Sequence, residues 1–262
     1  MKEVFKYTFT TVAEWKKFFI VVLIISILTL LEPYPFIGYT VLILEKLLYL
    51  SIGAFLIYLV KHSKDEKEYF ENLKKNDVST MLFHFFPTAA GIMLGSILIS
   101  AFWFIFFFLI LQFTNSLYIL ANPHSFFVAV SSSPVITQIL LGFYSIYLLF
   151  FSYVFLGKLG EALGKNSFKG AFVSIILSLI DFQYWIKTFN LKYFIIYIVW
   201  SIVILFIYSA MSFTYIFVIF PNIVLNPNLS LLIIPILVAA TTIITYFTFF
   251  SAYFANKTTG RN

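Results

Sequence analysis

Two adjacent charged residues, Glu45 and Lys46, lie inside an apolar stretch that runs from residue 37 to residue 60. One ionised side chain at the centre of a bilayer costs roughly 2.5–3.5 kcal/mol, so the pair costs about 5–7 kcal/mol. The Leu, Ile, Val and Phe residues around it return about 5–9 kcal/mol. Because this margin is small, the pair needs neighbouring helices or a wet cavity near the middle of its span. Neighbours on a helix point about 100° apart, so we expect each residue to have its own partners.

The pair has two interpretations, and the sequence leaves both open. It is either part of a path for a substrate, an ion or a proton, or a structural pair that fixes helix packing or lies near one membrane surface.

Two further sets of residues have helical spacing. Gly91 and Gly95 form a Gly-x-x-x-Gly pattern, which lets helix backbones approach closely, and we expect them to serve helix packing. Thr241, Thr245 and Thr248 share one face of a helix. Their hydroxyl groups either line a polar path or bond to backbone carbonyls and a neighbouring helix.

The residues needed for catalysis do not come together in this sequence. There is no cysteine, which excludes disulfides, thiol catalysis, iron–sulfur clusters and Cys-type zinc sites. His62, His84 and His124 lack zinc-ligand spacing. Residues 160–165 lack both the spacing and the Ser or Thr of a phosphate loop, and no Gly-x-Ser-x-Gly elbow occurs. We therefore expect no enzyme activity, no cofactor and no metal.

The elements that would carry these residues are membrane-spanning helices. Hydrophobic residues make up 61% of the chain and charged residues 11%, whereas about a quarter of a soluble domain is charged. Apolar runs near the length of about 20 residues that crosses a bilayer predict an all-α, polytopic bundle that forms a single transmembrane domain. Six spans are expected, at about 15–31, 37–60, 87–113, 135–156, 193–220 and 231–254.

The distribution of charge supports this count. The segments 1–14, 61–86, 157–192 and 255–262, with two lysines at the start of the first span, hold 16 of the 17 basic residues. Lys and Arg accumulate on the cytoplasmic side, so we expect a multi-pass protein of the cell membrane with both termini in the cytoplasm. The net charge of +6 is explained by lipid head groups and does not indicate nucleic acid.

The expected cytoplasmic segments also recur in a regular way. An amphipathic stretch precedes each pair of spans, which indicates three copies of one unit, a short interfacial helix and a hairpin. The apolar run 171–180 is too short to cross and is expected to be interfacial or buried.

Several short motifs resemble an uncharacterised prokaryotic multi-pass membrane family, catalogued as domain of unknown function 4013. They are Phe-Thr-Thr-Val-Ala-Glu-Trp-Lys-Lys at residues 9–17, Gly38-Tyr39 after a proline, and Phe-Lys-Gly-Ala-Phe at residues 168–172. The resemblance implies a topology and no reaction.

Two functions follow as hypotheses. The first is transport or permeation of a small solute, for which the Glu45–Lys46 pair is the motive. The second is a non-catalytic accessory or scaffold subunit, which would bind a membrane-protein partner or form a homo-oligomer within the lipid bilayer.

Overall fold

The computed structural model describes residues 1–34, 37–121, 126–214 and 230–260, and the described chain is helical without a strand. This confirms the all-α prediction. The long helices are α2 (Trp15–Leu31), α3 (Gly38–Lys61), α6 (Phe86–Phe113), α9 (Val135–Leu163), α12 (Leu191–Thr214) and α14 (Ser230–Lys257). The short ones are α1 (Lys2–Ala13), α4 (Glu66–Lys75), α5 (Val78–Phe83), α7 (Tyr118–Ala121), α8 (Phe126–Ser131), α10 (Phe168–Ile176), the 3₁₀ turn η2 (Leu177–Leu179) and α11 (Phe182–Thr188).

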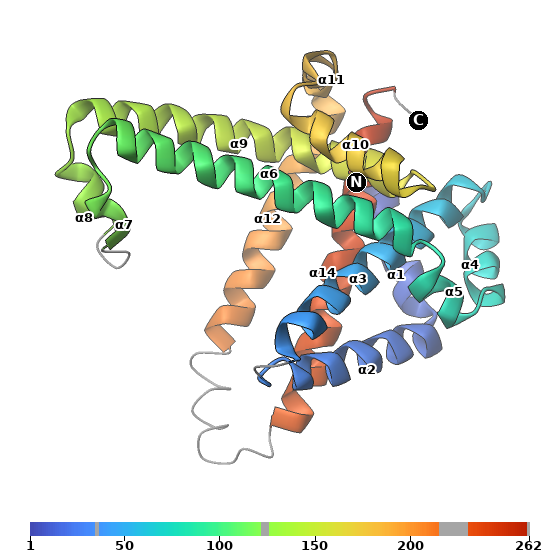
Figure 1. The fold of residues 1–262 in the computed structure, drawn as a ribbon. Helices are drawn as coiled ribbons and strands as arrows, with labels where there is room; N and C mark the ends of the chain where they lie inside the picture. Colours follow the sequence, from blue (N-terminus) through green and yellow to red (C-terminus); the bar gives the residue numbers. More distant parts are fainter. Residues whose placement is uncertain (35–36, 122–125, 215–229, 261–262) are drawn as a thin grey trace.

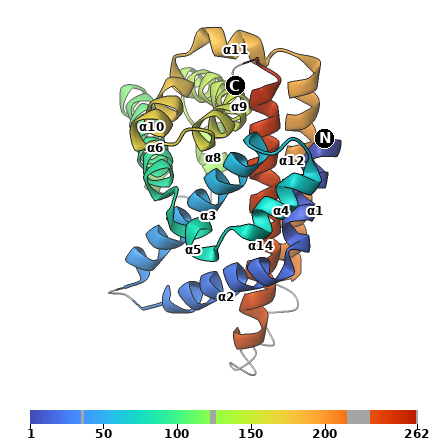
Figure 2. The same ribbon diagram turned by 90° about the vertical axis from the view of Figure 1, so that its right-hand side faces the viewer.

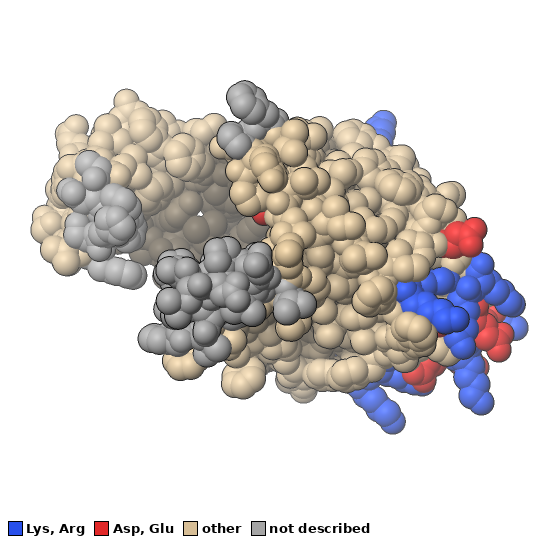
Figure 3. Space-filling model, turned by 90° about the horizontal axis from the view of Figure 1, so that it is seen from below, with Lys and Arg blue, Asp and Glu red and all other residues tan. Residues whose placement is uncertain are grey.

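The long helices diverge from one end of the molecule. Helices α6 and α9 run side by side as one arm, and α12 and α14 descend as another (Figure 1). Both ends of the chain and the short helices α1, α4, α5, α10 and α11 lie where the arms meet. Lys side chains, with Asp and Glu among them, gather over this region, and the rest of the visible face is almost uncharged and hollowed between the arms (Figure 3). We call this region the basic end.

Helix α14 is the central element, because it contacts α1, α2, α3, α9 and α12 (Figure 2). Glycine permits its closest approach to α9. A Cβ on Gly160 would run into the backbone carbonyl of Ala252, so only glycine lets these two backbones touch. Against α3, the missing side chain of Gly53 leaves room for the ring of Phe249.

Helix α10 lies across α6 and α9 at the basic end. A Cβ on Gly91 would collide with the carbonyl of Phe168, and one on Gly95 would press on Ile175. The Gly-x-x-x-Gly pattern therefore faces α10, a short helix, rather than another long one. The segment from α10 through η2 bends by 78° into α11, so the run 171–180 is a short, partly buried helix and a turn, in which Val173, Leu177 and Ile180 are exposed.

Helix α4 is fastened to α1 and α2 by polar contacts. The ammonium group of Lys17 donates to the carbonyl oxygens of Leu73, Lys74 and Asn76, at the carboxyl end of α4. A cation at this end satisfies carbonyls that lack helical partners. At the other end, the Asp65 carboxylate accepts from the Glu68 backbone N–H at 2.9 Å.

The helices follow the expected spans closely. Among the described residues, five helical segments are long and apolar enough to cross a membrane, one of them the joined segment Val78–Phe113. Helix α2 matches the first expected span but has 17 residues. Helix α9 continues to Leu163, beyond the expected end at 156. The expected end of the fifth span, at 220, lies outside the described residues, as do His124 and Arg261. The count of six spans stays a prediction.

Candidate functional site

Glu45 and Lys46 face different surroundings. Glu45 is the eighth residue of α3, so it lies roughly 7 Å from the helix midpoint at 1.5 Å per residue, and not near the middle as expected. Its side chain is 10% exposed, whereas that of Lys46 is 59% exposed. The two charged groups nevertheless approach to 3.8 Å, because the flexible lysine side chain folds back. Lys46 is therefore not part of the protein interior.

The principal partner of Glu45 is a second carboxyl group, that of Glu32 at the end of α2. The two side chains are in hydrogen-bonding contact, and the Thr29 side chain lies beside them. A hydrogen bond between two carboxyl groups needs a proton on one of them, because an ionised carboxylate only accepts. Glu32 also lines a cavity of about 310 Å³ with Tyr34, Gly38, Tyr39 and Leu42. The pair can therefore take up a proton or cation from the end of the molecule opposite the basic end.

Buried hydroxyl groups continue from this pair toward the basic end. Tyr49, one turn after Glu45 on α3, shares a hydrogen bond of 3.0 Å with Thr242 on α14. Tyr246, one turn after Thr242, is fully buried in the same core cluster as Tyr49 and Tyr69. Among the described residues, its hydroxyl group has no hydrogen-bond partner. A buried polar group without a protein partner is a site where water binds.

The hydroxyl groups reach the surface between α4 and α1. Tyr69 of α4 is fully buried, and its hydroxyl group lies 2.6 Å from that of Thr11 on α1. Burial raises the pKa of the Tyr69 phenol well above its usual range. One turn earlier, the Glu66 carboxylate accepts from the Thr10 hydroxyl and pairs with Lys6 at 2.9 Å. The Thr10 hydrogen bond, followed by the Lys6 contact, lowers the pKa of Glu66.

We call these groups together the polar file, in which Tyr246 makes no hydrogen bond to the Tyr49–Thr242 pair or to the Tyr69–Thr11 pair. Its members, in order, are Glu32, Glu45, Tyr49 with Thr242, Tyr246, Tyr69 with Thr11, and Glu66. The file passes between α2, α3, α14, α4 and α1. Its carboxyl pair lies at the α2–α3 turn, and its last member, Glu66, forms a surface ion pair with Lys6.

The threonine face of α14 is satisfied mostly by the helix itself. The hydroxyl group of Thr245 donates to the Thr241 carbonyl at 2.8 Å, and that of Thr248 to the Ile244 carbonyl at 2.9 Å. Thr248 also accepts from the Trp200 indole of α12 at 3.2 Å. The neighbouring Thr242 is the one that belongs to the polar file.

A second charged cluster lies at the basic end and is centred on Lys158 of α9. This side chain is 0% exposed, and its ammonium group lies 2.9 Å from Glu161 and 2.9 Å from Asp181. It also lies 4.2 Å from the ring centroid of Tyr184, whose hydroxyl donates to the Asn256 side chain at 3.1 Å. The cluster thus ties α9 to the bent α10–α11 segment and to α14. Lys165 lies 4.0 Å from Glu161, so two ammonium groups balance the two carboxylates.

Apart from Glu45, the sequence analysis did not identify the members of the polar file or of the Lys158 cluster as candidate site residues. A cue for the second was Asp181, a single charge within an otherwise apolar stretch, and Lys158 and Glu161 are three residues apart on a helix face. No such signal marks Tyr49, Tyr69 or Tyr246 among 17 tyrosines. Within the described part of the chain, no three His, Asp or Glu side chains gather as metal ligands do.

The fold and these sites define an all-α, multi-pass integral membrane protein, with five long apolar helices and a charged end. No family model, no curated protein and no solved structure matches the chain. The resemblance to the family of unknown function stays a prediction.

Proposed function

We propose that this chain transports a small cationic solute, the proton, across the cell membrane along the polar file. The basic end and both termini would face the cytoplasm. The carrying observation is the contact between the carboxyl groups of Glu32 and Glu45, with the buried hydroxyl groups of Tyr49, Tyr246 and Tyr69 in one core cluster. Ionisable side chains are costly in membranes and commonly mark ion pathways and proton relays.

The chemistry of the file favours protons over larger solutes. Carboxyl and hydroxyl groups each donate and accept, so a proton moves along them by exchange of hydrogen bonds, with water bridging the gaps. The side chains around the file are tightly packed, since Ile52, Tyr246 and Phe250 are 0% exposed. Such packing leaves room for water and protons, and excludes a solute of many atoms.

The proposed orientation rests on charge. The groups at the basic end include the basic clusters of α1, α4 and the α9–α10 connection. Because positively charged segments stay on the cytoplasmic side, Glu66 would face the cytoplasm and Glu32 the opposite side.

The proposal is tested with purified protein in liposomes that enclose a pH-sensitive dye, under an imposed membrane potential. We expect wild-type protein to acidify or alkalinise the lumen faster than protein-free liposomes. Glu45→Gln should slow this flux by about a hundredfold, the lower end of what a positioned proton-transfer group contributes. Lys46→Met should keep the flux, because its side chain is 59% exposed.

Glu71→Gln is the matched control, since Glu71 is exposed on α4 and loses the same charge. Equal flux from wild type and Glu45→Gln would refute the proposal. Flux no faster than that of protein-free liposomes would refute it as well.

The alternative, an accessory subunit, is favoured by the surface of α12. Only 6% of the most apolar stretch of α12 is buried within the chain, against 61% of that of α3. A transmembrane helix of a partner would cover this face. Purification in mild detergent distinguishes the two functions, because an accessory subunit carries a stoichiometric partner and a proton transporter conducts alone.

A further inference from the structure

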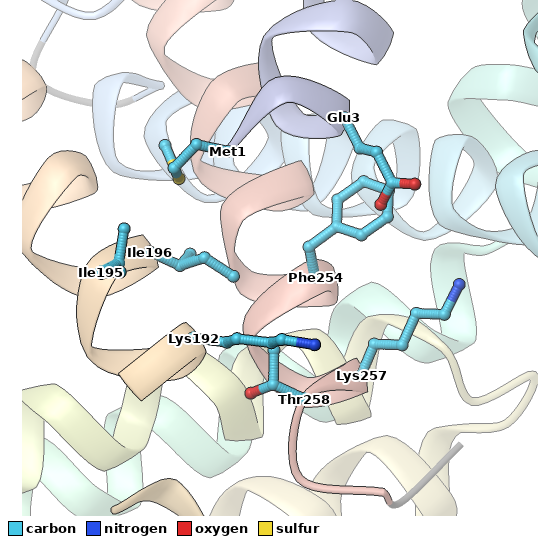
Figure 4. Close-up of a pocket in the computed structure, with 8 residues that line it drawn as sticks. All are labelled: Met1, Glu3, Lys192, Ile195, Ile196, Phe254, Lys257 and Thr258. Carbon is cyan, nitrogen blue, oxygen red and sulfur yellow. The ribbon is translucent and has the colours of Figure 1, made fainter. Parts of the chain in front are cut away.

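Three elements meet around a cavity at the basic end. They are the first turn of α1, the start of α12 and the last turn of α14. The cavity measures about 440 Å³, and its polar lining includes Glu3, Lys192 and Lys257. Figure 4 shows these three side chains placed around the space above Thr258, with the Lys192 ammonium group directed into it from α12. This volume lies in the range of small-molecule sites.

The remaining lining is apolar. Met1, Ile195, Ile196 and Phe254 form one wall between α12 and α14 (Figure 4). The apolar lining continues out of the cavity along α12, where Ile195, Ile202 and Leu205 are 45%, 60% and 70% exposed. The site is therefore amphipathic, with cations at the level of the basic end and an uncovered apolar surface leading toward the bilayer interior.

We infer that this cavity binds the headgroup of a monoanionic phospholipid with a phosphodiester, of which phosphatidylglycerol is the simplest. Lys192 and Lys257 hold the phosphate, and the acyl chains lie on the apolar face of α12. The side chains of Lys192, Lys257 and Glu3 together carry a formal charge of +1, which one phosphodiester neutralises. Lysine binds phosphate as a point charge, and basic pockets beside transmembrane helices take up lipid headgroups.

The apolar continuation is what favours a lipid over a free phosphate. A free phosphate gains nothing from Ile195 or from the exposed face beyond it. The acyl chains of a lipid gain van der Waals contacts at this surface, which a free phosphate cannot make. The inference is independent of proton transport, because none of these residues belongs to the polar file.

The test is a lipid titration of the purified protein, read by native mass spectrometry. Wild type should bind phosphatidylglycerol in preference to phosphatidylcholine and phosphatidylethanolamine. A lysine near an anionic surface is worth a factor of about five, so K192Q/K257Q together should weaken phosphatidylglycerol binding by about 25-fold. K192R/K257R should retain it, because the charge is kept.

The matched control is K74Q/K75Q, which removes the same charge from exposed lysines of α4. An equal loss in this control would mean that overall surface charge, and no site, attracts the lipid, and would overturn the inference. So would displacement of the lipid by the same concentration of soluble glycerol 3-phosphate, or a wild type without preference for phosphatidylglycerol.

Discussion

Replacing Tyr246 by Phe removes one hydroxyl group from the middle of the polar file, and we expect the protein to become more stable. The side chain is fully buried, and its hydroxyl has no hydrogen-bond partner among the described residues. An unsatisfied buried polar group costs about 1–3 kcal/mol. Phe fills the same space without this cost, so the gain in unfolding free energy should approach that value, and fall toward zero if water satisfies the group.

Tyr69 offers a matched comparison. It is equally buried, but its hydroxyl lies 2.6 Å from that of Thr11. Tyr69→Phe deletes this hydrogen bond and should destabilise by about 1 kcal/mol. The two variants remove the same atom from the same kind of residue, and yet their changes in unfolding free energy should have opposite signs. If water satisfies Tyr246, the two changes should still differ by at least the free energy of one hydrogen bond.

The assay is reversible unfolding in mixed micelles with rising sodium dodecyl sulfate, followed by circular dichroism. Equal destabilisation in both variants would refute the reasoning, since it would give Tyr246 a hydrogen-bond partner as strong as that of Tyr69. The liposome flux adds a second readout. Tyr246→Phe should slow proton movement even though it does not unfold the protein, a combination that a purely structural tyrosine does not produce.

Three further predictions concern other parts of the molecule. Lys158→Met should destabilise the protein by about 3–5 kcal/mol in the same unfolding assay, because two carboxylates lose their buried cation. Lys165→Met, at an exposed lysine, should cost under about 1 kcal/mol. Similar losses in the two variants would contradict the proposed cluster. Gly160→Ala should destabilise by about 1–3 kcal/mol through collision with α14, whereas Gly142→Ala on the same helix meets no neighbour and should be neutral or stabilising. The pKa of Glu66 is lowered in the folded protein, so the α1–α4 contact is stable above the unfolded pKa of about 4.3 and weakens as pH falls through the folded value. Spin labels on α1 and α4 of this cysteine-free chain should move apart on acidification, and Glu66→Gln should remove that pH dependence.

The positions of the long helices were predictable because they depend on local composition. The expected spans 15–31, 37–60 and 87–113 differ by no more than one residue at either end from α2, α3 and α6. A run of apolar residues must satisfy its backbone groups by helical hydrogen bonds in lipid, whatever its neighbours are. The fourth span was expected to end at 156, whereas α9 continues to Leu163 and buries Lys158 between the carboxylates of Glu161 and Asp181.

The helix that packs against a sequence pattern was harder to predict than the function of the pattern in packing. Gly91 and Gly95 were expected to pack a helix, and the structure places α10 against them. Sequence spacing reveals that one face of a helix carries small side chains, but any helix of suitable length can pack against that face. The same limit applies to Thr241, Thr245 and Thr248, whose spacing is equally compatible with a polar path and with bonds to the helix backbone.

By itself, the sequence determined the helical class, the membrane as solvent and the segregation of cations, because each follows from the composition of contiguous segments. Only the tertiary structure decided which buried charges meet. Glu32 contacts Glu45 across a hairpin, Thr242 bonds to Tyr49 from a helix far along the chain, and Lys158 pairs with Asp181 on a bent segment. Such contacts depend on how helices pair and rotate. The sequence around a polar side chain does not indicate which residue of another helix will become its partner.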